Sequence, residues 1–80
     1  MVDRLQGKKV VGIKQATKSI KAGLGNTLYL AEDADGKILN PLIELAKSNN
    51  VKIVFIDTMI ELGKLSGIDV GSAATLILKN

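Results

Sequence analysis

Three short apolar runs constrain what this 80-residue chain can fold into. Residues 27–31, 51–56 and 73–78 are almost continuously apolar, and runs of this length between turn signals are typical of buried strands. Such strands usually belong to sheets that helices cover on both faces. Residues 9–13 form a fourth strand-like run. The sequence therefore predicts a sheet of four strands.

Helical segments separate these runs, and they carry their own end signals. Gly23 fits the C′ position after a helix. Asn40 is suited to an N-cap, with Pro41 at the first helical position. Thr58 and Glu61 have the spacing of a capping box. These signals predict helices over residues 14–22, 41–48 and 58–66, and a short helical turn over residues 2–6.

This alternation predicts the fold class. Strands alternating with helices of about ten residues indicate an α/β fold, here a three-layer α/β/α sandwich with a four-stranded mixed sheet. We expect eighty residues with 46% apolar content to form one small domain, over residues 1–80. The chain has no cysteine, which excludes a disulfide framework and fits the cytoplasm. No apolar run approaches the roughly 20 residues of a bilayer span, so we expect no membrane partner.

Positive charge is concentrated near the N-terminus. Residues 1–25 contain six basic residues and one acidic residue, a net charge of +5, whereas residues 26–80 have a net charge of −2. A localised basic surface is the electrostatic pattern expected of a protein that binds nucleic acid. An anionic membrane would also attract it, but residues 14–22 lack the large apolar face of an interfacial anchor.

Residues 12–18 place a glycine directly before a basic helix. A helix N-terminus presents unpaired N–H groups to phosphate, and Gly12 lets a ligand approach the backbone closely. Gln15 carries a donor and an acceptor, which suits the edge of a nucleobase. Lysines at helical spacing form one basic stripe, which is either a phosphate-binding surface or a solvated face. The stripe consists of Lys14, Lys18 and Lys21.

The composition limits catalysis. The chain has neither histidine nor cysteine, so it lacks the usual general base near neutral pH and soft-metal ligands. Its carboxylate cluster of Glu32, Asp33 and Asp35 is either a weak Mg²⁺ site or an acidic loop after a strand, and we favour the loop. We therefore expect a non-catalytic protein without a cofactor or a metal site.

A second element of interest lies in the loop after the third helix. Ile68 and Val70 stand between two glycines, where they either pack against an unstacked base or cover the helix below. The only aromatic residues, Tyr29 and Phe55, lie in predicted strands, whereas single-stranded nucleic acid is usually held by several exposed aromatic rings. A folded RNA, recognised by its shape and phosphates, fits the chain better.

Three motifs in this order resemble the kink-turn RNA-binding family of ribosomal proteins L7Ae and L30e. Residues 12–18 (GIKQATK) match the family's Gly-x-Asn-Glu-x-x-Lys, residues 31–33 (AED) match its Ala-Glu-Asp, and residues 62–67 (LGKLSG) match its Leu-Gly-x-x-x-Gly. The resemblance covers residues 9–79 and is strongest to a short bacterial subgroup. It implies binding of RNA whose kink contains tandem sheared G·A pairs.

The resemblance also implies roles for the first motif. Lys14 and Gln15 would face the guanine edges, Lys18 would reach a guanine or a phosphate, and Gly12 would permit close approach. Two positions of this first motif depart from the family, because Lys14 stands in place of Asn and Gln15 in place of Glu. Gln15 keeps a carbonyl acceptor for the guanine but loses the charge, and charged hydrogen bonds are roughly twice as strong as neutral ones.

Asp33 matches a family carboxylate that organises the site, and Ile68 and Val70 would cover the loop nucleotides. Met59 replaces a lysine and Val70 an arginine that many members carry, which suggests altered affinity. We expect a monomeric protein that stabilises kink-turns in ribosomal RNA or a messenger RNA leader. The alternative is a protein-interaction adaptor on the same fold. The candidate RNA-binding residues are Gly12, Lys14, Gln15, Lys18, Lys21, Asp33, Ile68 and Val70.

Overall fold

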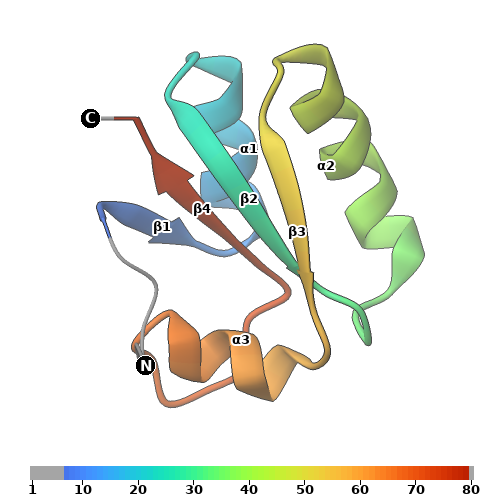
Figure 1. Cartoon of the computed structure of the whole chain (residues 1–80). Helices are drawn as coiled ribbons and strands as arrows, with labels where there is room; N and C mark the ends of the chain where they lie inside the picture. The colour runs from blue at the N-terminus through green and yellow to red at the C-terminus, as the bar shows by residue number, and fades with distance from the viewer. Residues whose placement is uncertain (1–6, 80) are drawn as a thin grey trace.

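The computed structural model describes residues 7–79 and alternates strands with helices along the chain (Figure 1). The helical turn predicted for residues 2–6 lies outside the described residues. The elements are β1 (Lys9–Val11), α1 (Ile13–Lys21), β2 (Gly25–Ala31), α2 (Gly36–Ser48), β3 (Lys52–Ile56), α3 (Met59–Leu65) and β4 (Ala74–Leu78).

The four strands form one sheet in the order β1-β4-β2-β3. β2 pairs with β3 in parallel, while β4 pairs antiparallel with both β1 and β2. The predicted four-stranded mixed sheet is therefore confirmed. A register shift between Gly25 and Thr27 interrupts the ladder near the start of β2. The order leaves β1 and β3 at the two edges of the sheet.

The helices lie on both faces of the sheet, as Figure 1 shows. Ala74 and Leu76 of β4 belong to one core with Ile20 of α1 and residues of α2. Thr75, between them, instead contacts Ser66 at the end of α3 through their hydroxyl oxygens, 2.6 Å apart. Because successive side chains of a strand point to opposite faces, α1 and α2 cover one face and α3 covers the other. This is the predicted three-layer arrangement.

The helices do not fully cover the edge strand β3. Its apolar sequence predicts burial on both faces, but the Phe55 side chain is 50% exposed. In β2, by contrast, Leu28 and Leu30 are completely buried. Burial of a leucine side chain contributes about 1.5–3 kcal/mol, so the central strands supply more of the stabilisation than β3 does.

The predicted start of α2 is wrong. Asn40 does not cap the helix and Pro41 is not its first residue, because α2 already begins at Gly36. Asp35 is the N-cap, and its carboxylate accepts a hydrogen bond from the backbone N–H of Lys37 at 2.9 Å. Pro41 lies inside the helix and offers no N–H to the carbonyl one turn before it. The N-cap at Asp35, and not Pro41, therefore marks the start of α2.

The other end signals are close to what the sequence predicts. Gly23 follows α1 with a positive φ of 77°, and its N–H donates to the carbonyl of Ile20 at 2.9 Å. The Thr58 hydroxyl accepts a hydrogen bond from the N–H of Glu61 at 3.0 Å, so Thr58 caps α3 as expected. The first strand ends at Val11 rather than at residue 13, because the backbone turns at Gly12.

Candidate nucleic-acid interface

Gly12 forms a sharp junction between β1 and α1. Its φ of 108° and ψ of 153° lie in a region that side chains rarely allow, so the turn itself requires glycine. Its N–H donates to the carbonyl of Ala74 at 2.9 Å, and its carbonyl accepts from Ala16 at 3.0 Å. A Cβ added at Gly12 would meet no atom within 4 Å. The surface above the turn is therefore open to a ligand.

The first turn of α1 presents backbone donors and basic side chains together. Gly12, the N-cap, makes no side-chain cap hydrogen bond, and the first N–H groups of a helix have no intrahelical acceptor. Lys14 and Gln15 are exposed in this turn, while Ala16 is completely buried and anchors the helix on the sheet. This end of α1 has the geometry and charge to receive a phosphate or the polar edge of a base.

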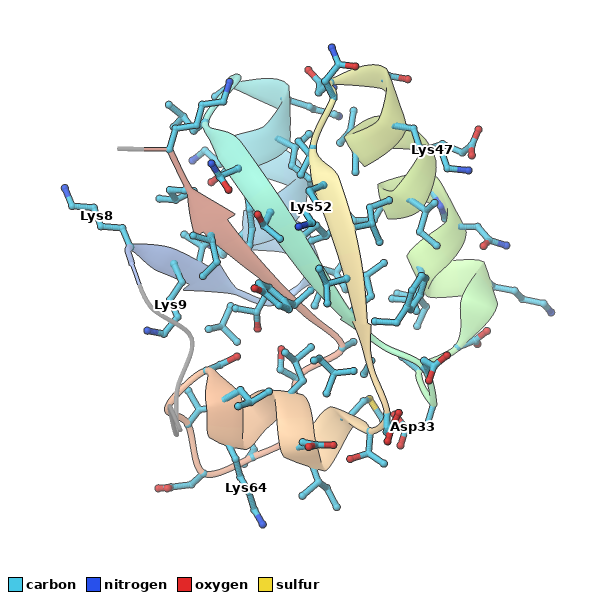
Figure 2. All side chains as sticks on the ribbon, in the orientation of Figure 1. Lys8, Lys9, Asp33, Lys47, Lys52 and Lys64 are labelled. Carbon is cyan, nitrogen blue, oxygen red and sulfur yellow. The ribbon has the colours of Figure 1, made fainter. Side chains whose placement is uncertain are left out.

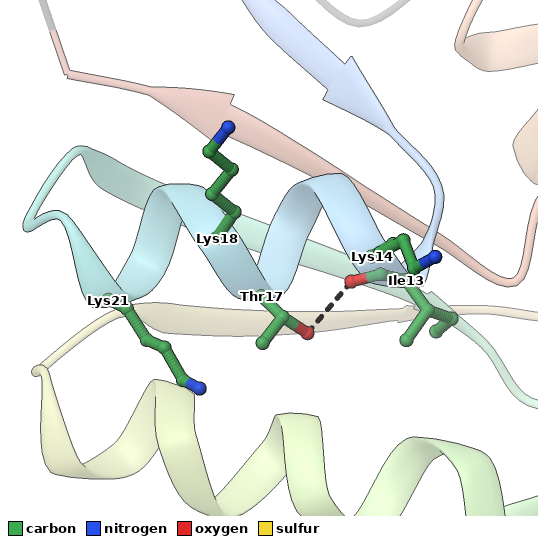
Figure 3. A pocket seen from close by; sticks show the side chains of 5 residues that line it. All are labelled: Ile13, Lys14, Thr17, Lys18 and Lys21. Atoms are coloured by element: carbon green, nitrogen blue, oxygen red, sulfur yellow. Dashed lines mark hydrogen bonds between the residues drawn. The ribbon is translucent and has the colours of Figure 1, made fainter.

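The predicted lysine stripe spreads over both sides of α1. Lys18 and Lys21 are exposed, but Figure 3 shows Lys18 pointing away from α2 and Lys21 pointing toward it. Thr17 lies between them, and its hydroxyl donates to the carbonyl of Ile13 at 2.8 Å. The three lysines therefore offer positive charge across the helix surface rather than along one line.

A shallow groove beside the lysines was not predicted from the sequence. It has a volume of about 260 Å³ and lies between α1 and α2. Its signal in the sequence is the spacing of apolar residues along α2, where Ile38 remains 51% exposed. The residues that line it are Ile13, Thr17, Lys21, Ile38, Pro41, Leu42 and Leu45.

The loop between α3 and β4 is fastened to α3. The N–H of Ile68 donates to the carbonyl of Gly63 at 3.0 Å, and the N–H of Ser72 donates to the carbonyl of Met59 at 2.9 Å. Ile68 is half-buried, whereas the side chain of Val70 is 70% exposed. Ile68 thus partly covers the helix, and Val70 is the apolar side chain that the loop offers to solvent.

Backbone hydrogen bonds bring the predicted elements to one end of the central strands β2 and β4. Gly12 is bonded to Ala74 at the start of β4, and the N–H of Ala31, the last residue of β2, donates to the carbonyl of Ala73 at 3.0 Å. The loop with Val70 leads directly into these residues. The start of α1, the end of β2 and the C-terminal end of this loop are therefore neighbours, although they are far apart in the sequence.

Asp33 has a structural role in this arrangement. One oxygen of its carboxylate accepts a hydrogen bond from the N–H of Met59 at 2.8 Å, which ties the loop after β2 to the start of α3. Figure 2 shows Asp33 beside the start of α3. Within residues 7–79, no cluster of three histidine, cysteine or carboxylate side chains is arranged to hold a metal ion. Nor does any helix in that range have the length and apolar character that a bilayer span requires.

Comparison with known proteins identifies the family. The sequence profile of the ribosomal protein L7Ae/L30e/S12e/Gadd45 family matches residues 2–80. The chain belongs to this family. This agrees with the resemblance seen in the three motifs, and the mixed sheet with its three helices is the fold of the family's solved structures.

Relatives of similar length occur in bacteria. The chain is 42% identical over 73 residues to a protein of Geobacillus sp. strain WCH70 that is named an RNA-binding protein, covering 91% of this chain and 89% of the relative. It is 40% identical, with the same coverage, to RNA-binding protein YbxF of Geobacillus stearothermophilus.

More distant relatives are longer. Identity to the large ribosomal subunit protein eL8 of Halobacterium salinarum is 36% over 78 residues, covering 96% of this chain and 65% of that protein. The solved structure of the Giardia lamblia 15.5kD RNA binding protein superposes with a TM-score of 0.83 at 26% identity. That match covers 90% of this chain and 61% of the Giardia chain.

In this L7Ae-family chain, most of the predicted site residues converge. Gly12, Lys14 and Gln15 occupy the start of α1, close in the fold to the loop that carries Ile68 and Val70. Lys18 and Lys21 extend the basic surface toward the far end of the helix. Asp33 also lies near this end of the sheet, but one oxygen of its carboxylate already accepts the hydrogen bond from the N–H of Met59 in α3.

Proposed function

We propose that this chain is a non-catalytic RNA-binding protein that recognises kink-turns through their tandem sheared G·A pairs. The observation that carries the proposal is that two different surfaces meet at one end of the central strands β2 and β4. One is the basic start of α1 that opens at Gly12, and the other is the loop that exposes Val70. Together they suit an RNA that presents phosphates and unstacked bases within a short distance.

The two surfaces contribute to RNA recognition in different ways. Lys14, Lys18 and Lys21 are exposed and attract phosphates, which supplies affinity but little discrimination between sequences. Gln15 lies among them with an amide that accepts and donates, so it is suited to read a guanine edge. Val70 offers an apolar contact to a base that the kink has released from stacking.

The protein would act on the conformation of the RNA. A kink-turn exists in bent and extended forms, and a protein that binds the bent form more tightly shifts the population toward it. Driving a two-state equilibrium from about 1:99 to 99:1 requires roughly 10⁴-fold tighter binding to the favoured state. We expect the chain to do this as a monomer in the cytoplasm, on ribosomal RNA or a messenger RNA leader.

The names of relatives also support RNA binding. Proteins that cover nearly the full length of this chain are named RNA-binding proteins. A direct test compares affinity for a kink-turn RNA with affinity for a matched duplex in which Watson–Crick pairs replace the tandem G·A pairs. We expect tight binding to the first RNA and weak, salt-sensitive binding to the second. Equal affinity for both RNAs would contradict the proposal.

A further inference from the structure

Three buried hydroxyl groups lie under the loop that exposes Val70. Ser66 and Ser72 are each 4% exposed, and Thr75 is completely buried. The Thr75 hydroxyl oxygen is 2.6 Å from that of Ser66 and 3.1 Å from that of Ser72. Buried hydroxyl groups are costly unless they are hydrogen-bonded, so a cluster of three demands complete pairing.

Counting protons fixes the direction of these hydrogen bonds. The Ser66 hydroxyl donates to the carbonyl of Leu62 at 2.7 Å, and the Ser72 hydroxyl donates to the carbonyl of Ala74 at 2.8 Å. Each hydroxyl has only one proton, so neither serine has a proton left for Thr75. Thr75 is therefore the donor to Ser66, the nearer of the two serine oxygens.

The three hydroxyl groups lie at both ends of the loop between α3 and β4. Ser66 is the C-cap of α3 and precedes the loop, whereas Ser72 ends it. Both contact the same side chain, Thr75, from opposite ends of the loop. The Thr75 hydroxyl thus donates to Ser66, where the chain leaves α3, and lies 3.1 Å from the hydroxyl oxygen of Ser72, near the place where the chain enters β4.

Gly63 restrains the middle of the same loop. It lies in α3 and is buried, and a Cβ added there would overlap the carbonyl oxygen of Val70 and lie 3.1 Å from the Cα of Gly71. The loop backbone can approach α3 this closely only because residue 63 has no side chain. Val70 therefore lies where the missing side chain of Gly63 lets the loop approach α3, and the hydrogen bond from Thr75 to Ser66 holds the start of the loop.

We propose that Thr75 and Gly63 are positioning residues that keep the loop in the conformation in which Val70 can contact RNA, before RNA binds. The inference rests on the proposed function and extends it to residues that do not touch the ligand. When only a fraction of molecules holds the binding-competent loop, the apparent dissociation constant rises by the inverse of that fraction. The hydroxyl cluster and the glycine contact raise this fraction before RNA binds.

Thr75→Val tests the role of the hydroxyl group, because valine keeps the branched shape but places a methyl group where the hydroxyl donates to Ser66. Thr75→Ser retains the donor and is the matched control. A typical net hydrogen bond corresponds to about 2- to 10-fold in an equilibrium constant. We therefore expect Thr75→Val to bind the kink-turn RNA more weakly, by up to about 2- to 10-fold, while Thr75→Ser restores most of the affinity. A Thr75→Val protein that binds like the wild type would overturn the inference.

A double-mutant cycle separates positioning from general damage to the fold. If Thr75 acts through Val70, Thr75→Val should cost little further affinity in a Val70→Ala background, but should keep its full effect in a Lys18→Ala background. An equal loss in both backgrounds would mean that Thr75 is merely structural. Ser72→Ala removes a contact at one end of the loop only and takes the place of Thr75→Val if that variant does not fold.

A measurement without RNA distinguishes failure of this inference from failure of the proposed function. The N–H groups of Ile68 and Ser72 are bonded to α3, so their hydrogen exchange reports how firmly the loop is held. Thr75→Val should speed exchange at both positions more than at Leu28 in the central strand. Unchanged exchange would refute the positioning role, whereas faster exchange in a protein that does not prefer kink-turn RNA would refute only the proposed function.

Discussion

The exposed lysines of α1 make a quantitative prediction about Lys18→Ala. If Lys14, Lys18 and Lys21 each neutralise one phosphate, the logarithm of the binding constant should fall with the logarithm of salt concentration with a slope of about −2 to −3. Raising the salt fourfold would then weaken wild-type binding by roughly 20- to 40-fold. With two contacts left, Lys18→Ala should lose only about 7- to 12-fold over the same range.

The assay is a fluorescence anisotropy titration of labelled kink-turn RNA at several salt concentrations. Lys47→Ala is the matched control, because Lys47 is also an exposed helical lysine but projects from the last turn of α2 (Figure 2). We expect the control to keep the wild-type slope and affinity. A Lys18→Ala protein with an unchanged slope and unchanged affinity would refute the assignment of Lys18 to the interface.

Three further variants probe base reading, the fold and the loop. Gln15→Ala should reduce discrimination against altered G·A pairs by about 1–3 kcal/mol, measured as the ratio of affinities for the two RNAs, because it removes an amide suited to a base edge. Asp33→Ala removes the carboxylate that accepts a hydrogen bond from the N–H of Met59, and it should lower the free energy of unfolding by about 0.5–2 kcal/mol, measured by urea denaturation. An unchanged midpoint of the urea unfolding curve would contradict this. Gly63→Ala should destabilise the protein by about 1–3 kcal/mol and weaken RNA binding, since a Cβ there displaces the backbone of Val70; wild-type affinity would show that the loop tolerates the shift.

Local signals predicted much of the fold. The apolar runs located three of the strands, and Gly23 and Thr58 marked helix ends correctly because capping depends on neighbouring residues. The start of α2 was missed because two local signals compete there. Pro41 suggested a later start, but Asp35 caps an earlier one, and the helix accommodates the proline in its interior.

The site was only partly predictable for a physical reason. Helical spacing placed the lysines on α1, but the contact between Asp33 and Met59 joins residues 26 positions apart and depends on how α3 packs. Ser66, Ser72 and Thr75 carry no individual signal, since serine and threonine are common at turns and in strands. Only the folded sheet brings their hydroxyl groups together, so their role becomes visible in the structure alone.

The bend of the RNA itself tests kink-turn recognition most directly. A kink-turn RNA with a donor and an acceptor dye on its two arms would be titrated with the protein in low salt without Mg²⁺, beside a control RNA in which the tandem G·A pairs are replaced. We expect a rise in energy transfer for the kink-turn RNA only, saturating at the protein concentration that saturates binding. Binding to both RNAs without a change in energy transfer would contradict kink-turn recognition, leaving a nonspecific basic surface and favouring a protein-interaction adaptor.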